Sequence, residues 1–148
     1  MKAEDMILLD NQLCFPLYVC AKEIVNVYTP ILRDLDLTYT QYITMMVMWE
    51  EKKVLTRRLK ERLYLDSGTL TPVLKKLEEK GLIKKERSTE DARDLEVRLT
   101  PKGEKLRTQA LEVPGQVGGC LCEMEGAEEL RTLLLRLMEL MKQRRENR

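Results

Sequence analysis

The sequence predicts a mainly helical protein with one small β-wing, and three observations support this fold class. Apolar residues recur at helical spacing along most of the 148 residues, of which 34% are charged and 5% aromatic. A capped helical segment over residues 66–80 is followed by two short alternating segments, 82–87 and 95–99, that are typical of paired strands. A short helix and a turn precede them. This order of elements indicates a winged helix-turn-helix.

Length and composition favour one compact domain, because neither an internal repeat nor a Gly/Ser/Pro linker divides the chain. The first ten residues, MKAEDMILLD, contain acidic side chains and only a four-residue apolar run. This pattern fits neither a secretory signal nor a membrane span. We therefore expect a cytoplasmic protein without a membrane partner.

Three helices are predicted before the recognition helix. The first covers residues 8–33, where apolar residues recur every three or four positions. The second begins after Thr38, because Thr38 and Gln41 match a capping box in which each side chain bonds the other's backbone N–H. Its apolar side chains are interpreted as core. The third is a short amphipathic helix over residues 55–63.

The recognition helix is predicted to begin at Asp66 or Ser67, which can cap it, and to end at Gly81. One face is apolar and packs inward. The other face carries Lys75, Lys76 and Lys80, which are predicted to be free for phosphate. The hairpin then follows, with a charged loop over residues 88–94.

After the hairpin, Thr100 and Pro101 match the cap and first position of another helix. The segments Val113-Pro114-Gly115 and Gly118-Gly119 are expected to interrupt or kink it. From Glu128 onward, a terminal helix carries an apolar stripe that pairs either with the first helix in a dimer interface or with the rest of its own chain.

The net charge of +1 hides a local imbalance. Residues 52–108 carry 17 basic and 10 acidic side chains, whereas residues 1–51 carry 3 and 8. A positive segment that coincides with the helix and hairpin can bind duplex DNA by releasing counterions. The pairs Lys52-Lys53 and Arg57-Arg58 are interpreted as phosphate contacts, with a solvated face as the alternative. The candidates for groove and phosphate contact on the recognition helix are Ser67, Thr69, Thr71, Lys75 and Lys76.

Four separated segments carry a resemblance to a known family: Leu9 to Phe15, Leu37 to Tyr39, Glu61 to Pro72 and Asp91 to Arg93. On these residues the chain resembles the MarR family of regulators, and within it the organic hydroperoxide resistance regulators. The resemblance covers nearly the whole chain. It implies a homodimeric repressor that binds a pseudo-palindromic DNA operator, with residues 37–99 as the DNA-binding lobe and residues 1–36 and 100–148 as the dimerisation region. It also implies that an organic hydroperoxide oxidises the N-terminal cysteine and releases the DNA.

By this resemblance Cys14 is the redox sensor, and tyrosines matching Tyr28 and Tyr39, with Tyr18 nearby, donate to its thiolate. If the first helix begins near Asp10, Cys14 lies one turn inside it, where the positive end of the helix dipole favours a thiolate. Pro16 is expected to bend the helix there.

The same resemblance gives a role to the charged pair at the wing tip. Arg93 resembles the arginine that enters the minor groove, and Asp91 resembles the residue that orients it. An exposed pair without a DNA role is the alternative interpretation.

The remaining cysteines leave several readings open. Cys120 or Cys122 of the other subunit is a candidate to resolve the oxidised Cys14 as a disulfide, and a small cellular thiol is the alternative. A zinc site fits poorly because the chain has no histidine and the cysteine spacings are unusual, so no cofactor is expected.

Three other functions compete with a peroxide-sensing repressor. A thiol peroxidase would use Cys14 but would not need the basic wing, so an enzyme is not expected. A family regulator released by a small aromatic ligand, in the cleft between the dimer and DNA lobes, is the closest alternative. A winged helix that binds proteins rather than DNA is the third.

Overall fold

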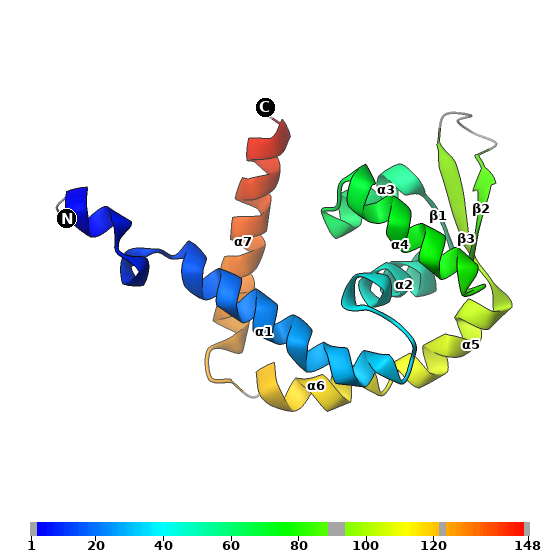
Figure 1. The fold of residues 1–148 in the computed structure, drawn as a ribbon, viewed down its shortest axis with the longest axis horizontal. Coiled ribbons are helices and arrows are strands. Elements are labelled where there is room, and N and C mark those ends of the chain that lie inside the picture. The colour runs from blue at the N-terminus through cyan, green and yellow to red at the C-terminus, as the bar shows by residue number, and fades with distance from the viewer. Residues whose placement is uncertain (1–2, 89–93, 122–123, 147–148) are drawn as a thin grey trace. The chain divides into compact units, whose positions relative to one another are not determined.

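The structure is a computed structural model that describes residues 3–88, 94–121 and 124–146. The chain forms two compact units, Met1–Val113 and Pro114–Arg148, and each is described by itself. The predicted mainly helical fold with a small wing is confirmed (Figure 1). The first unit holds η1 (Ala3–Ile7), η2 (Leu9–Asn11), α1 (Cys14–Arg33), α2 (Tyr39–Glu51), β1 (Lys53–Leu55), α3 (Thr56–Leu63), α4 (Ser67–Glu79), β2 (Ile83–Arg87), β3 (Leu95–Leu99) and α5 (Pro101–Ala110).

Helix α1 begins later than the sequence predicts. Its first residue is Cys14, and two short 3-10 helices, η1 and η2, occupy the segment before it. Pro16 explains the difference, because a proline has no N–H and is accommodated in the first turn of a helix, where amide groups have no intrahelical partner. The expected bend at Pro16 is therefore replaced by a later helix start.

Helix α2 forms the centre of the first unit. The predicted capping box is confirmed, since the Thr38 hydroxyl accepts from the Gln41 amide at 3.3 Å and the Gln41 side chain accepts from the Thr38 amide at 3.2 Å. The helix is apolar on most sides, and Met45 and Met48 are completely buried. This helix contacts α1, α3, α4 and α5, so it is the scaffold on which the other helices of the unit pack.

The helix-turn-helix consists of α3 and α4. Tyr64 ends α3 with a left-handed backbone (φ 54°), and Asp66 caps α4 by accepting from the Thr69 amide at 2.9 Å. Leu70, Leu74 and Leu77 are buried, as the apolar spacing predicts. The predicted helix stop is also confirmed, since φ at Gly81 is +72°.

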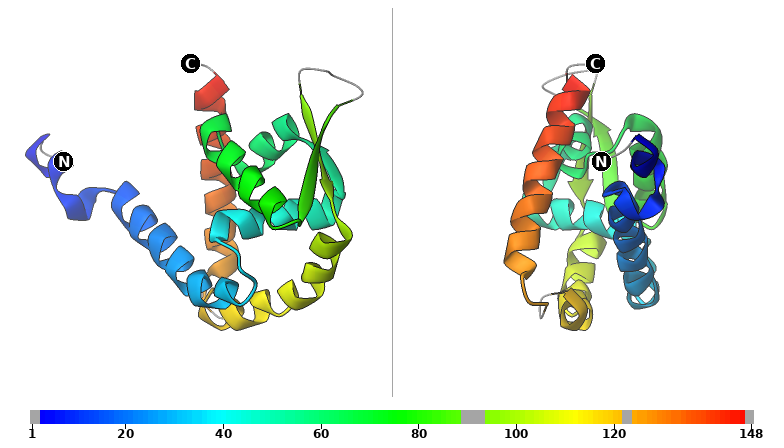
Figure 2. Two further views of the ribbon diagram at one scale, coloured as in Figure 1. Left: turned by 45° about the vertical axis from the view of Figure 1, so that its right-hand side comes forward. Right: turned by 90° about the vertical axis from the view of Figure 1, so that its left-hand side faces the viewer.

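A three-stranded antiparallel sheet, in the order β1-β3-β2, forms the wing beside α4 (Figure 2). The hairpin of β2 and β3 was expected, and its register pairs Lys85 with Val97. Strand β1 was not expected. It pairs Val54 with Val97, and it takes up residue 55, so α3 starts one residue later than predicted. Both Val54 and Val97 are buried, which anchors the base of the wing.

Helix α5 begins as predicted, with the Thr100 hydroxyl accepting from the Gly103 amide at 3.0 Å. The chain between α5 and the next helix breaks at residues 111–112. Helix α6 (Val113–Leu121) then runs through Gly118 and Gly119, so the glycine pair does not interrupt a helix as expected.

The second unit ends with α7 (Ala127–Glu146), the terminal helix that the sequence predicts. Its apolar side chains are exposed to solvent in the single chain, which is unusual for so many large aliphatic residues. Across the part of the chain that the structure describes, no helix has the length and apolarity to span a bilayer. The exposed apolar residues include Leu130, Leu133, Leu134, Leu140 and Met141.

Candidate DNA-binding surface and sensor cysteine

The N-terminus of α4 is organised by the Asp66 carboxylate. It accepts from the Thr69 amide at 2.9 Å and from the Thr69 hydroxyl at 3.0 Å. These bonds, with the backbone N–H of Thr69 as the larger contributor, lower the pKa of Asp66 below its ordinary value. The Thr69 hydroxyl, a predicted DNA contact, is thus engaged in the cap of its own helix.

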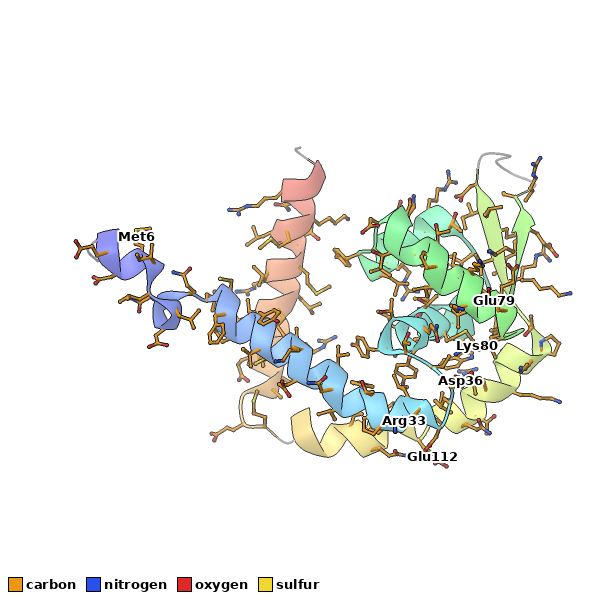
Figure 3. All side chains as sticks on the ribbon, viewed as in Figure 1. Met6, Arg33, Asp36, Glu79, Lys80 and Glu112 are labelled. Atoms are coloured by element: carbon orange, nitrogen blue, oxygen red, sulfur yellow. The ribbon has the colours of Figure 1, made fainter. Side chains whose placement is uncertain are left out.

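The other candidates on α4 lie on its exposed side, where Ser67, Thr71, Lys75 and Lys76 all face solvent. The two lysines share one carboxylate, because Glu79 lies 3.9 Å from the Lys75 ammonium and 3.1 Å from that of Lys76. Figure 3 shows Glu79 at the end of this helix. The exposed side of α4 can therefore offer hydroxyls near its start and partly neutralised ammonium groups near its end.

A small pocket of about 120 Å³ lies where α3, α4 and the wing meet. Ser67 and Thr71 line it together with two lysines, Lys60 and Lys85. The Lys60 ammonium lies 3.3 Å from the Ser67 hydroxyl, and Lys85 is paired with Glu78 at 2.9 Å. Hydroxyl and ammonium donors converge here beside the exposed side of α4.

The wing carries a carboxylate that is almost fully buried, Glu96 on β3. One of its oxygens lies 2.6 Å from the Lys53 ammonium, and the other lies 2.5 Å from Nε of Arg98. The hydrogen bond from Lys53 is the main reason why the pKa of Glu96 is lowered, and Arg98 adds to it. Lys53, predicted to contact phosphate, instead joins β1 to β3.

Three more basic residues that were predicted to contact phosphate also lie beside carboxylates. The Lys52 ammonium binds Glu104, Nε of Arg57 lies 3.7 Å from Asp94, and Nε of Arg58 lies 3.7 Å from Glu51. The first contact joins the end of α2 to α5, and the other two join α3 to the wing and to α2. The sequence could not show them, because each partner is distant in the chain or belongs to another element.

Some predicted site residues fall where the structure gives no side-chain information. Asp91 and Arg93 of the wing loop and Cys122 lie outside the described residues. Cys120 lies in α6. Their roles in DNA contact and in disulfide formation stay predictions.

Cys14 is exposed and is the first residue of α1. It does not lie one turn inside the helix as expected, since η2 ends before it. Tyr18, one turn further along α1, is 64% exposed, and Phe15 is 39% exposed. In the single chain, the sensor candidate therefore lies in an open apolar segment. Cys20 is also exposed.

The two other predicted tyrosines lie together, far from Cys14 along the chain. The rings of Tyr28 and Tyr39 are 5.0 Å apart, and Tyr42 lies 5.9 Å from Tyr28. Tyr28 follows Cys14 by fourteen residues on one helix, which corresponds to about 21 Å at 1.5 Å per residue. One chain therefore does not bring the cysteine and this tyrosine pair together.

Tyr42 is a member of this aromatic cluster that sequence reasoning assigned to the core. It is buried, and its ring also lies 6.2 Å from that of Trp49. Burial, with the nearby hydroxyls of Tyr28 and Tyr39, raises the pKa of Tyr42. Trp49 belongs to this cluster and is buried as well. The spacing of Tyr39 and Tyr42 on one helix was the available signal.

A larger pocket, of about 400 Å³, lies beside the same cluster. Tyr39 lines it, with apolar Val25 and Leu37 and the basic side chains of Arg33 and Lys80. Sequence reasoning did not identify this pocket, because its lining comes from α1, the turn after it, the start of α2 and the end of α4.

Lys80 was predicted to be free for phosphate, but its side chain does not face solvent. Its ammonium points to the turn between α1 and α2, where it pairs with Asp36 at 3.2 Å (Figure 3). Among the described residues, no three or more potential metal-binding side chains gather into a site.

Comparisons with known proteins agree with this architecture. The family model described as "Transcriptional regulator SarA/Rot" matches residues 26–109. The organic hydroperoxide resistance transcriptional regulator of Bacillus subtilis (strain 168) is 40% identical over 141 residues, which is 95% of this chain and 96% of that protein. These are families of transcriptional regulators, not of enzymes.

Solved structures of AbfR, a protein of Staphylococcus epidermidis, are also similar. Reduced AbfR bound to DNA is 33% identical, with a TM-score of 0.81 and coverage of 97% of this chain and 98% of that one. Disulfide-formed AbfR is 34% identical, with a TM-score of 0.63 and coverage of 91% and 96%. The chain therefore belongs to the MarR and SarA type of winged helix-turn-helix transcriptional regulators, in the group that includes the organic hydroperoxide resistance regulator.

Proposed function

We propose that this regulator is a repressor that binds a pseudo-palindromic DNA operator and releases it when an organic hydroperoxide oxidises Cys14. The observation that carries the proposal is the exposed Cys14 at the start of α1 in a chain with an intact recognition helix and wing. The relatives support a redox-responsive regulator, because AbfR has been solved in a reduced form bound to DNA and in a form with a disulfide.

The chemistry needs only the cysteine and the peroxide. The Cys14 thiolate attacks the terminal oxygen of the hydroperoxide, a sulfur–oxygen bond forms and the oxygen–oxygen bond breaks. The alkoxide leaves, takes a proton and becomes an alcohol, while Cys14 becomes a sulfenic acid. The peroxide is reduced by the two electrons that the sulfur loses.

The sulfenic acid can then condense with a second thiol. A thiolate of Cys120 or Cys122 of the other subunit, or of a small cellular thiol, attacks the sulfur of the sulfenic acid. The disulfide bond forms, the sulfur–oxygen bond breaks, and the hydroxide that leaves takes a proton to become water. Which thiol reacts sets whether the oxidised form is linked between subunits.

A homodimer completes the site in this proposal. Tyr28 lies about 21 Å along α1 from the Cys14 of its own chain, and the ring of Tyr39 lies beside it, so both are suited to donate to the sensor of a second subunit. The exposed apolar residues at the start of the chain and on α7 supply surface for such an assembly. We assign residues 37–99 to the DNA-binding lobe and residues 1–36 and 100–148 to the dimerisation region.

DNA contact is assigned to the exposed side of α4 and to the wing. We assign Ser67, Thr71, Lys75 and Lys76, which are exposed, to the major groove, and we assign Arg93, with Asp91 as its orienting partner, to the minor groove. Thr69 contributes by completing the cap that holds the start of α4.

A second candidate is release by a small ligand instead of by oxidation. The pocket of about 400 Å³ favours it, since aromatic Tyr39 and cationic Arg33 and Lys80 suit a small aromatic acid.

One titration separates the two functions. Anisotropy of a labelled operator, selected from random DNA, is measured with reduced wild type and Cys14→Ser while cumene hydroperoxide is added. Release of wild type alone supports peroxide sensing. Release of neither contradicts it and leaves the small-ligand function, which Cys14→Ser should retain. No binding by the reduced protein would remove the assignment to DNA.

A further inference from the structure

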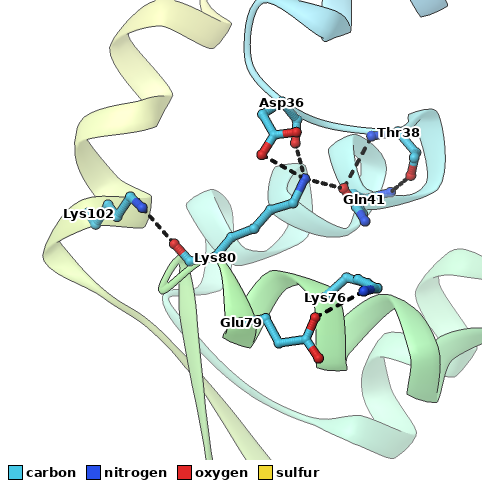
Figure 4. Close-up of polar contacts among 7 residues, drawn as sticks. All are labelled: Asp36, Thr38, Gln41, Lys76, Glu79, Lys80 and Lys102. Carbon is cyan, nitrogen blue, oxygen red and sulfur yellow. Dashed lines mark hydrogen bonds and ion pairs between the residues drawn. The ribbon is translucent and has the colours of Figure 1, made fainter.

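The side chain of Lys80 joins the end of the recognition helix to the turn between α1 and α2. Its ammonium donates to the backbone carbonyl of Asp36, pairs with the Asp36 carboxylate at 3.2 Å, and lies 3.3 Å from Oε1 of Gln41 (Figure 4). An ammonium has three N–H donors, so these three acceptors can engage all of them. The side chain is 24% exposed, less than the lysines on the other face of α4.

The acceptors of Lys80 belong to the turn after α1 and to α2; the Asp36 side chain is 87% exposed, but its backbone is fixed by neighbouring contacts. Asp36 has a left-handed backbone (φ 51°), and its neighbour Leu37 donates to the carbonyl of Leu32 at 3.0 Å. Leu32, near the end of α1, is completely buried. Gln41 is the second residue of the capping box of α2. A displacement of the end of α1 would therefore move the acceptors of the Lys80 ammonium.

The backbone of Lys80 is bonded to α4 and to α5. Its amide donates to the carbonyl of Lys76 at 3.1 Å, and its carbonyl accepts from the Lys102 ammonium of α5 at 2.7 Å. Lys80 therefore contacts three helices and one turn through separate groups. We refer to Lys80, Asp36 and Gln41 together as the Lys80 latch.

We propose that the Lys80 latch positions α4 relative to α1, so that oxidation of Cys14 at the start of α1 changes the position of the recognition helix, α4. This inference rests on the proposed function, because it assumes that oxidation of Cys14 weakens DNA binding. Lys80 is a positioning residue and does not touch peroxide. Its ammonium is directed toward Asp36, so its loss should change the response to oxidation more than the affinity of the reduced protein.

The test compares the ratio of operator Kd after and before oxidation in three proteins. Lys80→Met keeps the aliphatic stem and removes the donors. Lys105→Met is the matched control, because Lys105 is an exposed α5 lysine with no ion pair among the described residues. We expect Lys80→Met to lower the ratio about threefold or more relative to wild type, as for mutations within a coupling network, and Lys105→Met to leave it unchanged.

A conservative variant distinguishes positioning from a general loss of stability. Lys80→Arg retains charge and donors, so it should restore most of the ratio, whereas a purely structural contribution would give equal ratios in all folded variants. A ratio in Lys80→Met equal to that of wild type overturns the proposal. So does a uniform loss of reduced-state affinity with a smaller salt slope, which would identify Lys80 as a phosphate contact.

Failure of the proposed function would be visible separately, as a wild type that peroxide does not release. Whether Lys80 holds the end of α4 to the turn between α1 and α2 is then tested by amide hydrogen exchange of the reduced proteins. Faster exchange at residues 36–41 and at the end of α4 in Lys80→Met, but not in Lys105→Met, supports the latch. Unchanged exchange overturns it.

Discussion

The indole N–H of Trp49 donates a 2.8 Å hydrogen bond to the carbonyl oxygen of Gly103, in the interior of the first unit. Trp49 lies on α2 and Gly103 in the first turn of α5, so the bond joins the central helix to the helix that follows the wing. A Cβ atom on residue 103 would overlap the Leu82 carbonyl and lie 2.7 Å from Cδ1 of Leu99. Residue 103 must be small because α5 meets the start of the wing there.

Gly103→Ala should therefore destabilise the protein. Overpacking at a site with backbone on one side costs about 1–3 kcal/mol. Urea unfolding followed by circular dichroism measures the loss. Gly118→Ala is the matched control, because nothing lies within 4 Å of a Cβ there and alanine favours a helix. Equal effects of the two substitutions would contradict the packing argument.

The capping box of α2 should contribute to stability through Thr38. Thr38→Ala removes the acceptor for the Gln41 amide and should cost about 1 kcal/mol of unfolding free energy. Thr108→Ala, at an exposed position of α5, should change stability little. The same urea experiment tests both, and a loss at Thr108 as large as at Thr38 would show that capping is not the cause.

The wing should lose stability in acid through Glu96. The pKa of this carboxyl is lowered in the folded protein by Lys53 and then by Arg98, so the unfolded state binds its proton more readily. Its contribution is fully present above the ordinary glutamate value of about 4.3 and is lost as the pH falls through the lowered folded pKa.

Thermal unfolding at a series of pH values tests this contribution. Glu96→Gln should be less stable than wild type near neutral pH, and the difference should shrink toward low pH. A difference that does not depend on pH would assign the role of Glu96 to packing alone.

Glu79 should limit the affinity for DNA. It pairs with both Lys75 and Lys76 on the exposed side of α4, so Glu79→Gln frees two cations and removes one negative charge. Operator binding should strengthen by about two- to fivefold, the range that exposed ion pairs allow. Glu112→Gln is an exposed control beyond α5. Fluorescence anisotropy of a labelled operator at several salt concentrations measures both affinities. Weaker binding by Glu79→Gln would show that the exposed side of α4 does not contact the DNA.

The helix starts could be predicted from the sequence because they depend on local chemistry. Thr38, Asp66 and Thr100 each bond an amide three residues later, so the signal and the structure lie within one turn. The start of α1 was misplaced because the apolar spacing continues before Pro16, while the proline favours a helix that begins at Cys14.

Features that depend on distant partners could not be predicted in this way. Strand β1 has only three residues, and it exists because Val54 pairs with Val97 more than forty positions away. Lys80 was grouped by spacing with the solvent-facing lysines of α4, and its approach to Asp36 sets it apart. The sensor role of Cys14 is a proposal that began from the resemblance, because its exposure and position carry no unique sequence signal.

The loop end of the wing hairpin is closed by residues that flank the tip. The Ser88 amide donates to the Asp94 carbonyl at 3.1 Å, the Thr56 hydroxyl binds the Asp94 side chain, and β3 is paired along both edges. Both ends of the intervening loop are thus tethered to the scaffold whatever residues lie between them. Because surface loops tolerate insertions and replacements, we expect sequence changes there to leave the fold of the stem unchanged, and under the proposed function such changes would alter operator preference alone.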